Sequence, residues 1–170
     1  MAKQDPLKML ASVPIFEELS TKELKSIASS AKEVTHREGH VLAREGESGV
    51  GFFLILEGDV AVAVGGRSMR KMGPGDFFGE TTLIEMHPRH FSVVVERDAR
   101  LLELTNADLY NLYLQDVKSY VLVLQNINRE LCRRLRRASN RITAYADEAG
   151  DEVTQIRTEP APPRAKGGSS

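Results

Sequence analysis

Residues 75–92 have the sequence GDFFGETTLIEMHPRHFS, and this stretch differs from everything around it. Its neighbours are short runs of β-branched residues, whereas residues 79–86 show no alternation of apolar and polar side chains. Gly75 precedes that segment and Pro88 follows it, and both residue types interrupt regular structure. The pattern predicts one or two helical turns inserted between strands.

The residue types in this stretch suit recognition of a phosphate joined to a sugar. Gly79 lets a ligand approach the backbone closely, and the first turn of the following helix presents N–H groups to an anion. Arg89 is placed to bind the same anion with a bidentate guanidinium, and Glu80 to accept hydrogen bonds from vicinal hydroxyls. The plainer alternative is a strand–turn–helix in which Arg89 forms a surface ion pair and Glu80 favours the helix N-terminus. The residues alone leave both interpretations open.

Outward from this stretch, residues 32–104 are strand-like. Residues 60–64 (VAVAV), 91–95 (FSVVV) and 101–104 (LLEL) have the composition of strands, and Gly65-Gly66 is typical of a tight hairpin turn. Several short strands separated by glycines predict an antiparallel sandwich or barrel.

Helical patterns flank the strands on both sides. We expect Ser20 or Thr21 to cap an N-terminal helix, and Thr105 or Asn106 to cap a second helix after the last strand. A longer helix is expected from about Asp116 to Arg137, with one apolar face made by Tyr120, Leu124, Ile127, Leu131 and Leu135. Cys132 is interpreted as a packed small residue.

Taken together, these features resemble the cyclic nucleotide-binding domain family, which includes cAMP-dependent kinase regulatory subunits, nucleotide-gated channels and the bacterial catabolite activator protein. The resemblance runs from about Phe16 to Leu135. The residues that carry it are Gly39-His40-Val41, Gly46, Phe53-Leu54-Ile55, Gly58-Asp59-Val60, Gly73-Pro74-Gly75, Phe78-Gly79-Glu80 through Leu83, and Pro88-Arg89.

The resemblance implies that Arg89 pairs with the cyclic phosphate and that Glu80 binds the ribose 2′-hydroxyl, while backbone amides of Gly79 and nearby residues, including Thr82 and His90, complete the site. His90 and Phe91 stand where the family has small residues. Phe91 is therefore expected either to reshape the pocket or to point into the barrel core. The expected ligand-binding residues are Phe78, Gly79, Glu80, Thr81, Thr82, Arg89, His90, Phe91 and Ser92.

Composition excludes several other classes of protein. The net charge is −1, with one cysteine and no apolar run of about 18 residues, so a nucleic-acid coat, a disulfide framework and a membrane span are not expected. The four histidines have no zinc-site spacing, which argues against a metal. The N-terminus lacks a secretory signal, so we expect a cytoplasmic protein. Direct DNA binding is not expected, because the arginines of residues 129–141 suit a solvated helix face.

We therefore expect a mainly β protein: an antiparallel β-roll or jelly-roll barrel with N-terminal helices (1–31), a cyclic nucleotide-binding roll with C-terminal helices (32–137) and a flexible polar tail (138–170). The expected function is a non-catalytic regulatory module that binds a cyclic mononucleotide, with cAMP favoured over cGMP, and signals through its C-terminal lid helix to a downstream protein. A homodimer through that helix is a further expectation. The alternative is a fold that has lost mononucleotide binding and acts as a scaffold or binds a cyclic dinucleotide.

Overall fold

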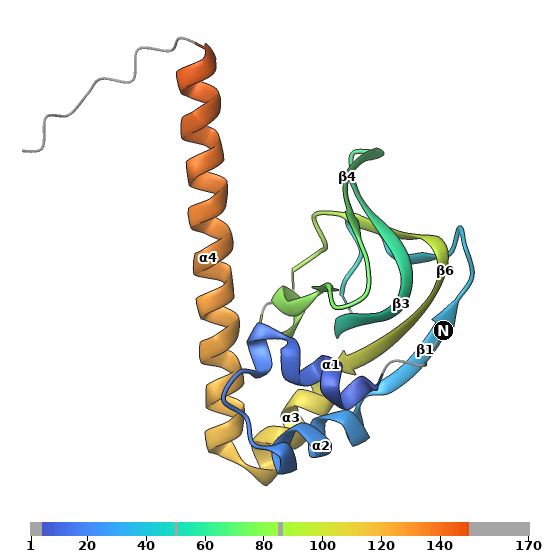
Figure 1. The fold of residues 1–170 in the computed structure, drawn as a ribbon, viewed down its shortest axis with the longest axis vertical. Helices are drawn as coiled ribbons and strands as arrows, with labels where there is room; N and C mark the ends of the chain where they lie inside the picture. Colours follow the sequence, from blue (N-terminus) through green and yellow to red (C-terminus); the bar gives the residue numbers. More distant parts are fainter. Residues whose placement is uncertain (1–4, 50, 85–86, 150–170) are drawn as a thin grey trace, which may run out of the picture. The chain divides into compact units, whose positions relative to one another are not determined.

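The computed structural model describes residues 5–49, 51–84 and 87–149. The chain divides into two compact units, residues 1–132 and residues 133–170. The first unit is a curled antiparallel sheet with helices α1, α2 and α3 gathered beside it (Figure 1). The described part of the second unit is the C-terminal portion of helix α4.

One sheet contains every strand of the described residues. Its main path runs β1-β6-β3-β4, while β2 pairs with β6 and β5 pairs with β3. All of these pairings are antiparallel. The strands are β1 (Lys32–His36), β2 (Val41–Ala43), β3 (Gly51–Val64), β4 (Arg67–Met72), β5 (Phe77–Phe78) and β6 (Ser92–Thr105).

The two longest strands, β3 and β6, bend together, and this bend makes the sheet a roll. Their register shifts between Ile55 and Val60, where bulges let a strand turn sharply. Gly58 lies at the bend with φ +89°, and a Cβ there would come within 2.3 Å of the Asp98 carbonyl oxygen. The expected β-roll with flanking helices is confirmed, and Gly65-Gly66 forms the expected turn between β3 and β4.

Residues 91–95 and 101–104, which the pattern presents as separate strands, are parts of the single strand β6. Between them the apolar alternation is lost, but cross-strand ion pairs keep the polar residues in the sheet. Arg97 pairs with Asp59 at 2.6 Å, and Arg100 pairs with Glu57 at 2.6 Å and with Glu33 at 3.0 Å.

The helices begin where the caps predict. Ser20 caps α2 and Thr105 caps α3, each in a reciprocal capping box with an acidic residue three positions later. The inserted segment is a single 3-10 turn, η2, rather than an α-helix. The helical elements are α1 (Pro6–Ser12), η1 (Pro14–Phe16), α2 (Thr21–Ser30), η2 (Glu80–Leu83), α3 (Asn106–Gln115) and α4 (Val117–Ala149).

Helix α4 differs from its expected form in three respects. It continues past Arg137 to Ala149, because neither glycine nor proline occurs before Gly150; residues 150–170 of the expected tail lie outside the described residues. Of the expected apolar face, Ile127 is fully buried but Leu135 is exposed. Cys132 is exposed rather than packed, because it lies off the face that the first unit buries.

Alternate residues of β3 and β6 feed two separate apolar cores, as a pleated sheet with two covered faces requires. We call these the helical core and the roll core. The helical core consists of Met9, Leu10, Val13, Ile15, Phe16, Leu24, Ile27, Phe52, Leu54, Leu56, Leu83, Leu102, Leu104, Leu109, Leu112, Val123 and Ile127. The roll core consists of Ala43, Phe53, Ile55, Val60, Met72, Phe78, Val93, Val95, Ala99 and Leu101.

Candidate functional site

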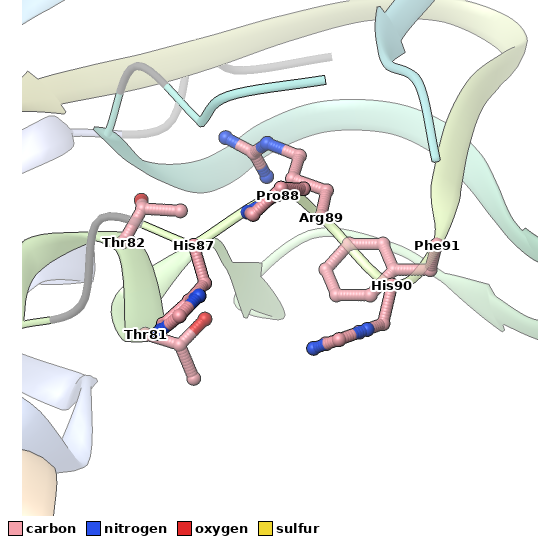
Figure 2. A pocket seen from close by; sticks show the side chains of 7 residues that line it. All are labelled: Thr81, Thr82, His87, Pro88, Arg89, His90 and Phe91. Carbon is pink, nitrogen blue, oxygen red and sulfur yellow. The ribbon is translucent and has the colours of Figure 1, made fainter. Parts of the chain in front are cut away.

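Residues of the η2 turn and of the 87–91 segment line a pocket of about 80 Å³. Five of the nine residues expected in a ligand site line it, together with His87 and Pro88, which had no expected role (Figure 2). The lining residues are Thr81, Thr82, His87, Pro88, Arg89, His90 and Phe91.

Arg89 is fixed in this pocket by its backbone and by one end of its guanidinium. Its N–H donates to the Glu47 carbonyl at 2.9 Å, and its carbonyl accepts from the Gly46 N–H at 2.8 Å. The side chain is only 6% exposed, and its Nη2 donates to the Gly51 carbonyl at 3.2 Å. Its Nη1 is buried and has no hydrogen-bond partner. A buried, unpartnered guanidinium nitrogen at a pocket is a position that an anionic acceptor would satisfy.

The electrostatic environment of Arg89 points the same way. Burial lowers the pKa of its guanidinium, while the Glu80 carboxylate acts in the opposite direction. Arginine stays protonated in proteins, so the fold carries the cost of removing a positive charge from water. A bound anion would offset that cost.

Gly49 and Gly51 lie close to the residues of this site, and sequence reasoning did not assign them to it. A Cβ on Gly49 would lie 2.1 Å from Thr82 Cγ2 and 3.1 Å from Arg89 Nε. Gly79 has φ +84°, and a Cβ on it would lie 2.3 Å from the Gly51 carbonyl oxygen. The sequence signal for these close approaches is the short spacing between Gly49 and Gly51. Only glycine permits these backbone approaches.

Thr82 is held inside the structure rather than directed at a ligand. Its hydroxyl lies 2.6 Å from the Gly79 carbonyl oxygen and 3.0 Å from that of Gly51. Its backbone N–H donates to the Gly79 carbonyl at 3.1 Å, which closes the 3-10 turn. The amide that the family resemblance assigns to the ligand is thus already paired in this structure.

The two positions that depart from the family pattern differ in their surroundings. Figure 2 shows the Arg89 side chain leaving the 87–91 segment on the side opposite to the imidazoles of His87 and His90. His90 is exposed, whereas Phe91 is half-buried and contacts the roll core while also lining the pocket. Phe91 therefore lies where the pocket meets the roll core.

Four of the expected residues lie beside the pocket without lining it. Phe78 belongs to the roll core, and Gly79 with Glu80 begins the η2 turn, where Glu80 is buried. The Ser92 hydroxyl accepts a hydrogen bond from the Glu45 N–H at 3.0 Å. These residues support the site, and Glu80 also acts on Arg89 through its charge.

Within residues 5–49, 51–84 and 87–149, no group of three or more His, Cys, Asp or Glu side chains is placed to hold a metal ion. His36 and His40 do stack, with ring centroids 4.1 Å apart. None of the helices in the part of the chain that the structure describes combines the length and apolar character needed to cross a bilayer.

Residues 33–116, which include the sheet, the pocket and α3, match the family described as the cyclic nucleotide-binding domain. They belong to that family. Its domains are regulatory and typically non-catalytic.

Relatives and solved structures agree with the family assignment. The chain is 37% identical over 101 residues to a cyclic nucleotide-gated potassium channel of Mesorhizobium japonicum; the match covers 59% of this chain and 28% of the channel. It is 31% identical over 130 residues to a cyclic AMP receptor protein of Thermus thermophilus, covering 74% of this chain and 58% of the receptor. A crystal structure of a cyclic nucleotide-binding domain from Methylobacillus flagellatus superposes with a TM-score of 0.71 at 26% identity, covering 82% of each chain. The matches thus span 28% and 58% of the length of these two curated relatives.

Proposed function

We propose that this chain is a non-catalytic regulatory module that binds a cyclic mononucleotide, with Arg89 contacting the cyclic phosphate and Glu80 the ribose 2′-hydroxyl. The observation that carries the proposal is the buried Nη1 of Arg89, which lies at a pocket and has no partner. A negatively charged phosphate supplies the kind of acceptor that this buried guanidinium nitrogen lacks. A pocket of about 80 Å³ is smaller than the roughly 300–1,000 Å³ of typical ligand pockets, so ribose and base must extend beyond it or displace the side chains of His90 and Phe91.

The connection to the helices supports a signalling role. The η2 turn carries Leu83, which packs in the helical core with Val123 and Ile127 of α4. A nucleotide that shifts η2 changes the packing of Leu83 and so biases the position of α4. In this proposal the output is conformational, because ligand binding favours one arrangement of the helices over another.

Titration calorimetry with cAMP and cGMP tests the phosphate contact. Arg89→Ala should weaken binding by about 30-fold to several thousand-fold, since removing one partner of a buried charge pair costs about 2–5 kcal/mol. The matched control is Arg44→Ala, which removes the same charge from an exposed side chain on the neighbouring turn. Circular dichroism verifies that each variant folds. Binding by Arg89→Ala at the parent's affinity contradicts the proposal.

Glu80→Gln provides an independent test of the ribose contact. We expect a smaller loss than for Arg89→Ala, and we expect the loss to shrink with a 2′-deoxy nucleotide, which lacks the hydroxyl that Glu80 would accept from. Equal losses with both ligands rule out the ribose role.

A second candidate function follows from His90 and Phe91. A fold that no longer binds mononucleotides would act as a scaffold or bind a cyclic dinucleotide, and the small pocket edged by two larger side chains favours it. A thermal-shift series separates the candidates, since a ligand at 100 times its dissociation constant adds about 2.7 kcal/mol of stability. We expect the largest shift with cAMP, then cGMP. A shift only with cyclic dinucleotides, or with none of the three, favours the second candidate.

A further inference from the structure

A second pocket, of about 350 Å³, lies where α2 and α3 meet, next to the start of α4. It is larger than the pocket at Arg89, which has about 80 Å³, and it falls within the size range of typical small-molecule sites, about 300–1,000 Å³. Its lining residues lie within 20–26 and 112–116, whereas those of the pocket at Arg89 lie within 81–91. The two pockets are therefore separate places on the first unit.

The lining of the second pocket combines charged, polar and apolar side chains. Glu23 and Asp116 contribute negative charges and Lys22 a positive charge, so negative charge is in excess. Leu112, a residue of the helical core, supplies the apolar part of the lining. The remaining lining residues are polar and uncharged: Ser20, Ser26 and Gln115.

The two carboxylates of this pocket converge on one hydroxyl. Ser119 is 2% exposed, and its Oγ lies within hydrogen-bond distance of Glu23 Oε1 and 2.7 Å from Asp116 Oδ2. A hydroxyl carries a single proton, so it donates to one carboxylate at a time and turns a lone pair toward the other. At any moment, one of the two carboxylate oxygens that face Ser119 therefore receives no proton from it.

Both carboxyl groups are ionised at neutral pH. Hydrogen bonds from Ser119 and Ser20 lower the pKa of Glu23, although the negative charge of Asp116 opposes this shift. Hydrogen bonds from Ser119 and from the Lys118 N–H lower the pKa of Asp116. Two like charges held beside one hydroxyl favour a cationic group that lies next to both.

Hydrogen-bond acceptors also predominate in this lining. The Ser26 hydroxyl donates its proton to Gln115 Oε1 at 3.0 Å and so links α2 to α3, which leaves its oxygen with lone pairs to offer. The donors of the lining are the Lys22 ammonium and the Gln115 side-chain NH₂, whereas each carboxylate accepts several hydrogen bonds. A ligand rich in N–H donors suits such a lining.

We propose that this pocket binds a small molecule that carries a primary ammonium group on a short alkyl chain. The ammonium group brings N–H donors and a positive charge to Glu23 and Asp116, and the alkyl chain contacts Leu112. The two carboxylates repel an anion, and a neutral molecule leaves their mutual repulsion uncompensated. The proposal goes beyond nucleotide binding and does not depend on it, because Arg89 belongs to the other pocket.

Nuclear magnetic resonance titration of the isotope-labelled full chain tests the proposal, with pentylamine as the probe at constant ionic strength. We expect saturable shifts of the backbone amide signals of residues 20–26 and 112–116. Pentanol has the same alkyl chain without the charge, and it should leave these signals unshifted. The proposal is overturned if pentylamine causes no saturable shift there. It is also overturned if Mg²⁺ shifts these signals and pentylamine does not, because that result indicates a metal-ion site.

Conservative variants identify the groups that bind the probe. Glu23→Gln and Asp116→Asn remove one charge each and keep side chains that can cap α2 and α4. Each should weaken pentylamine binding by about 10-fold or more, because a charge-assisted hydrogen bond is lost. The control Glu17→Gln removes the same charge at an exposed position outside the pocket and should bind pentylamine as the parent does. Parent affinity in both pocket variants overturns the proposal.

Arg89→Ala separates this proposal from the proposed nucleotide site. This variant should bind pentylamine with the parent's affinity even where it no longer binds nucleotide. A loss of pentylamine binding in Arg89→Ala, with the fold intact, contradicts the assignment of the amine to the second pocket.

Discussion

The roll core and the helical core differ in how they are assembled. The roll core comes mainly from strands that share one hydrogen-bonded ladder, so its residues are held in place by the backbone as well as by packing. The helical core collects side chains from α1, η1, α2, α3, α4 and η2 against one face of that sheet, and these segments meet through side chains. The difference indicates a stiff frame beside a layer of separate pieces that can shift against it.

The candidate site belongs to both cores. Phe78, just before the η2 turn, belongs to the roll core, and Phe91, at the end of the 87–91 segment, contacts it. Leu83, at the end of η2, lies in the helical core. One end of the site is thus anchored to the frame and the other to the movable layer. Substitutions in the two cores should therefore have separable effects.

The largest effect is expected in the frame. Ile55→Ala removes a fully buried roll-core side chain and should lower the free energy of unfolding by about 2–5 kcal/mol. Chemical denaturation measures the loss, and Met69→Ala, at an exposed position of β4, should stay within about 0.5 kcal/mol of the parent. Nucleotide affinity of the folded fraction should not change. Selective loosening of the helices in Ile55→Ala, with the sheet intact, contradicts the division into frame and layer.

Leu83→Ala probes the movable layer. Leu83 is 8% exposed, so we expect a loss near the lower end of the range, about 2 kcal/mol. Hydrogen exchange gives the distinguishing result. In the parent, bound nucleotide should slow the exchange of amides 120–132, whereas in Leu83→Ala it should not. Leu109→Ala removes a helical-core residue outside the site and should preserve the nucleotide effect. If nucleotide still slows the exchange of amides 120–132 in Leu83→Ala, the η2 turn does not transmit the effect of binding to α4.

Phe91→Ala tests the edge where the roll core meets the pocket. Because the Phe91 ring is only half-buried, its removal should cost less than the removal of a fully buried ring. The free energy of unfolding should fall by about 1–2 kcal/mol. The relative affinities for cAMP and cGMP should also change, as measured by competition binding. Val62→Ala, another half-buried residue at the roll core, should lower stability and leave the ranking unaltered. If the relative affinities for cAMP and cGMP are unchanged in Phe91→Ala, the ring contributes to packing alone.

The smallest effect is acid sensitivity confined to the helical layer. The Ser119 hydroxyl donates to the Glu23 carboxylate and links α4 to α2, and this bond lowers the pKa of Glu23. A depressed carboxyl pKa stabilises the fold above the ordinary value of 4.5, and that stabilisation is lost as the pH falls through the lowered folded-state pKa.

Glu23→Gln should therefore be slightly less stable than the parent at about pH 6, by about 0.5 kcal/mol or less given partial exposure, and the difference should shrink as the pH falls below 4.5. Glu17→Gln, an exposed neighbour, should show no such convergence. A difference that grows on acidification contradicts this account.

The sequence was sufficient where structure is determined locally. Ser20 and Thr105 were predicted among the helix caps because a capping side chain bonds within one turn of its own position. The Gly65-Gly66 turn was predicted because the positive φ angles that it needs are available to glycine without help from distant residues. The continuity of β6 could not be found this way. It depends on Asp59 and Glu57 of another strand, which pair with Arg97 and Arg100 only after the sheet has formed.

The site shows the same limit. Arg89 was identified from its place after Pro88, but its orientation depends on Gly46, Glu47 and Gly51, about forty residues earlier in the chain. That the Thr82 amide is already paired follows from the 3-10 form of η2, which the pattern alone could not distinguish from an α-helical turn. Contacts across such sequence distances are fixed by the fold.

The hydrogen bond from Arg89 to the Gly51 carbonyl has a consequence for the speed and tightness of ligand capture. A free arginine must surrender rotational freedom of its long side chain when it binds an anion, at about 2 kcal/mol. Here the Gly51 carbonyl accepts a hydrogen bond from one guanidinium nitrogen of Arg89, and Gly49 lies close to Nε. The side chain has therefore lost most of its rotational freedom on folding. In the proposed binding mode, a neutral carbonyl orients the guanidinium without neutralising it, so Arg89 would be preorganised for a charged ligand before that ligand arrives.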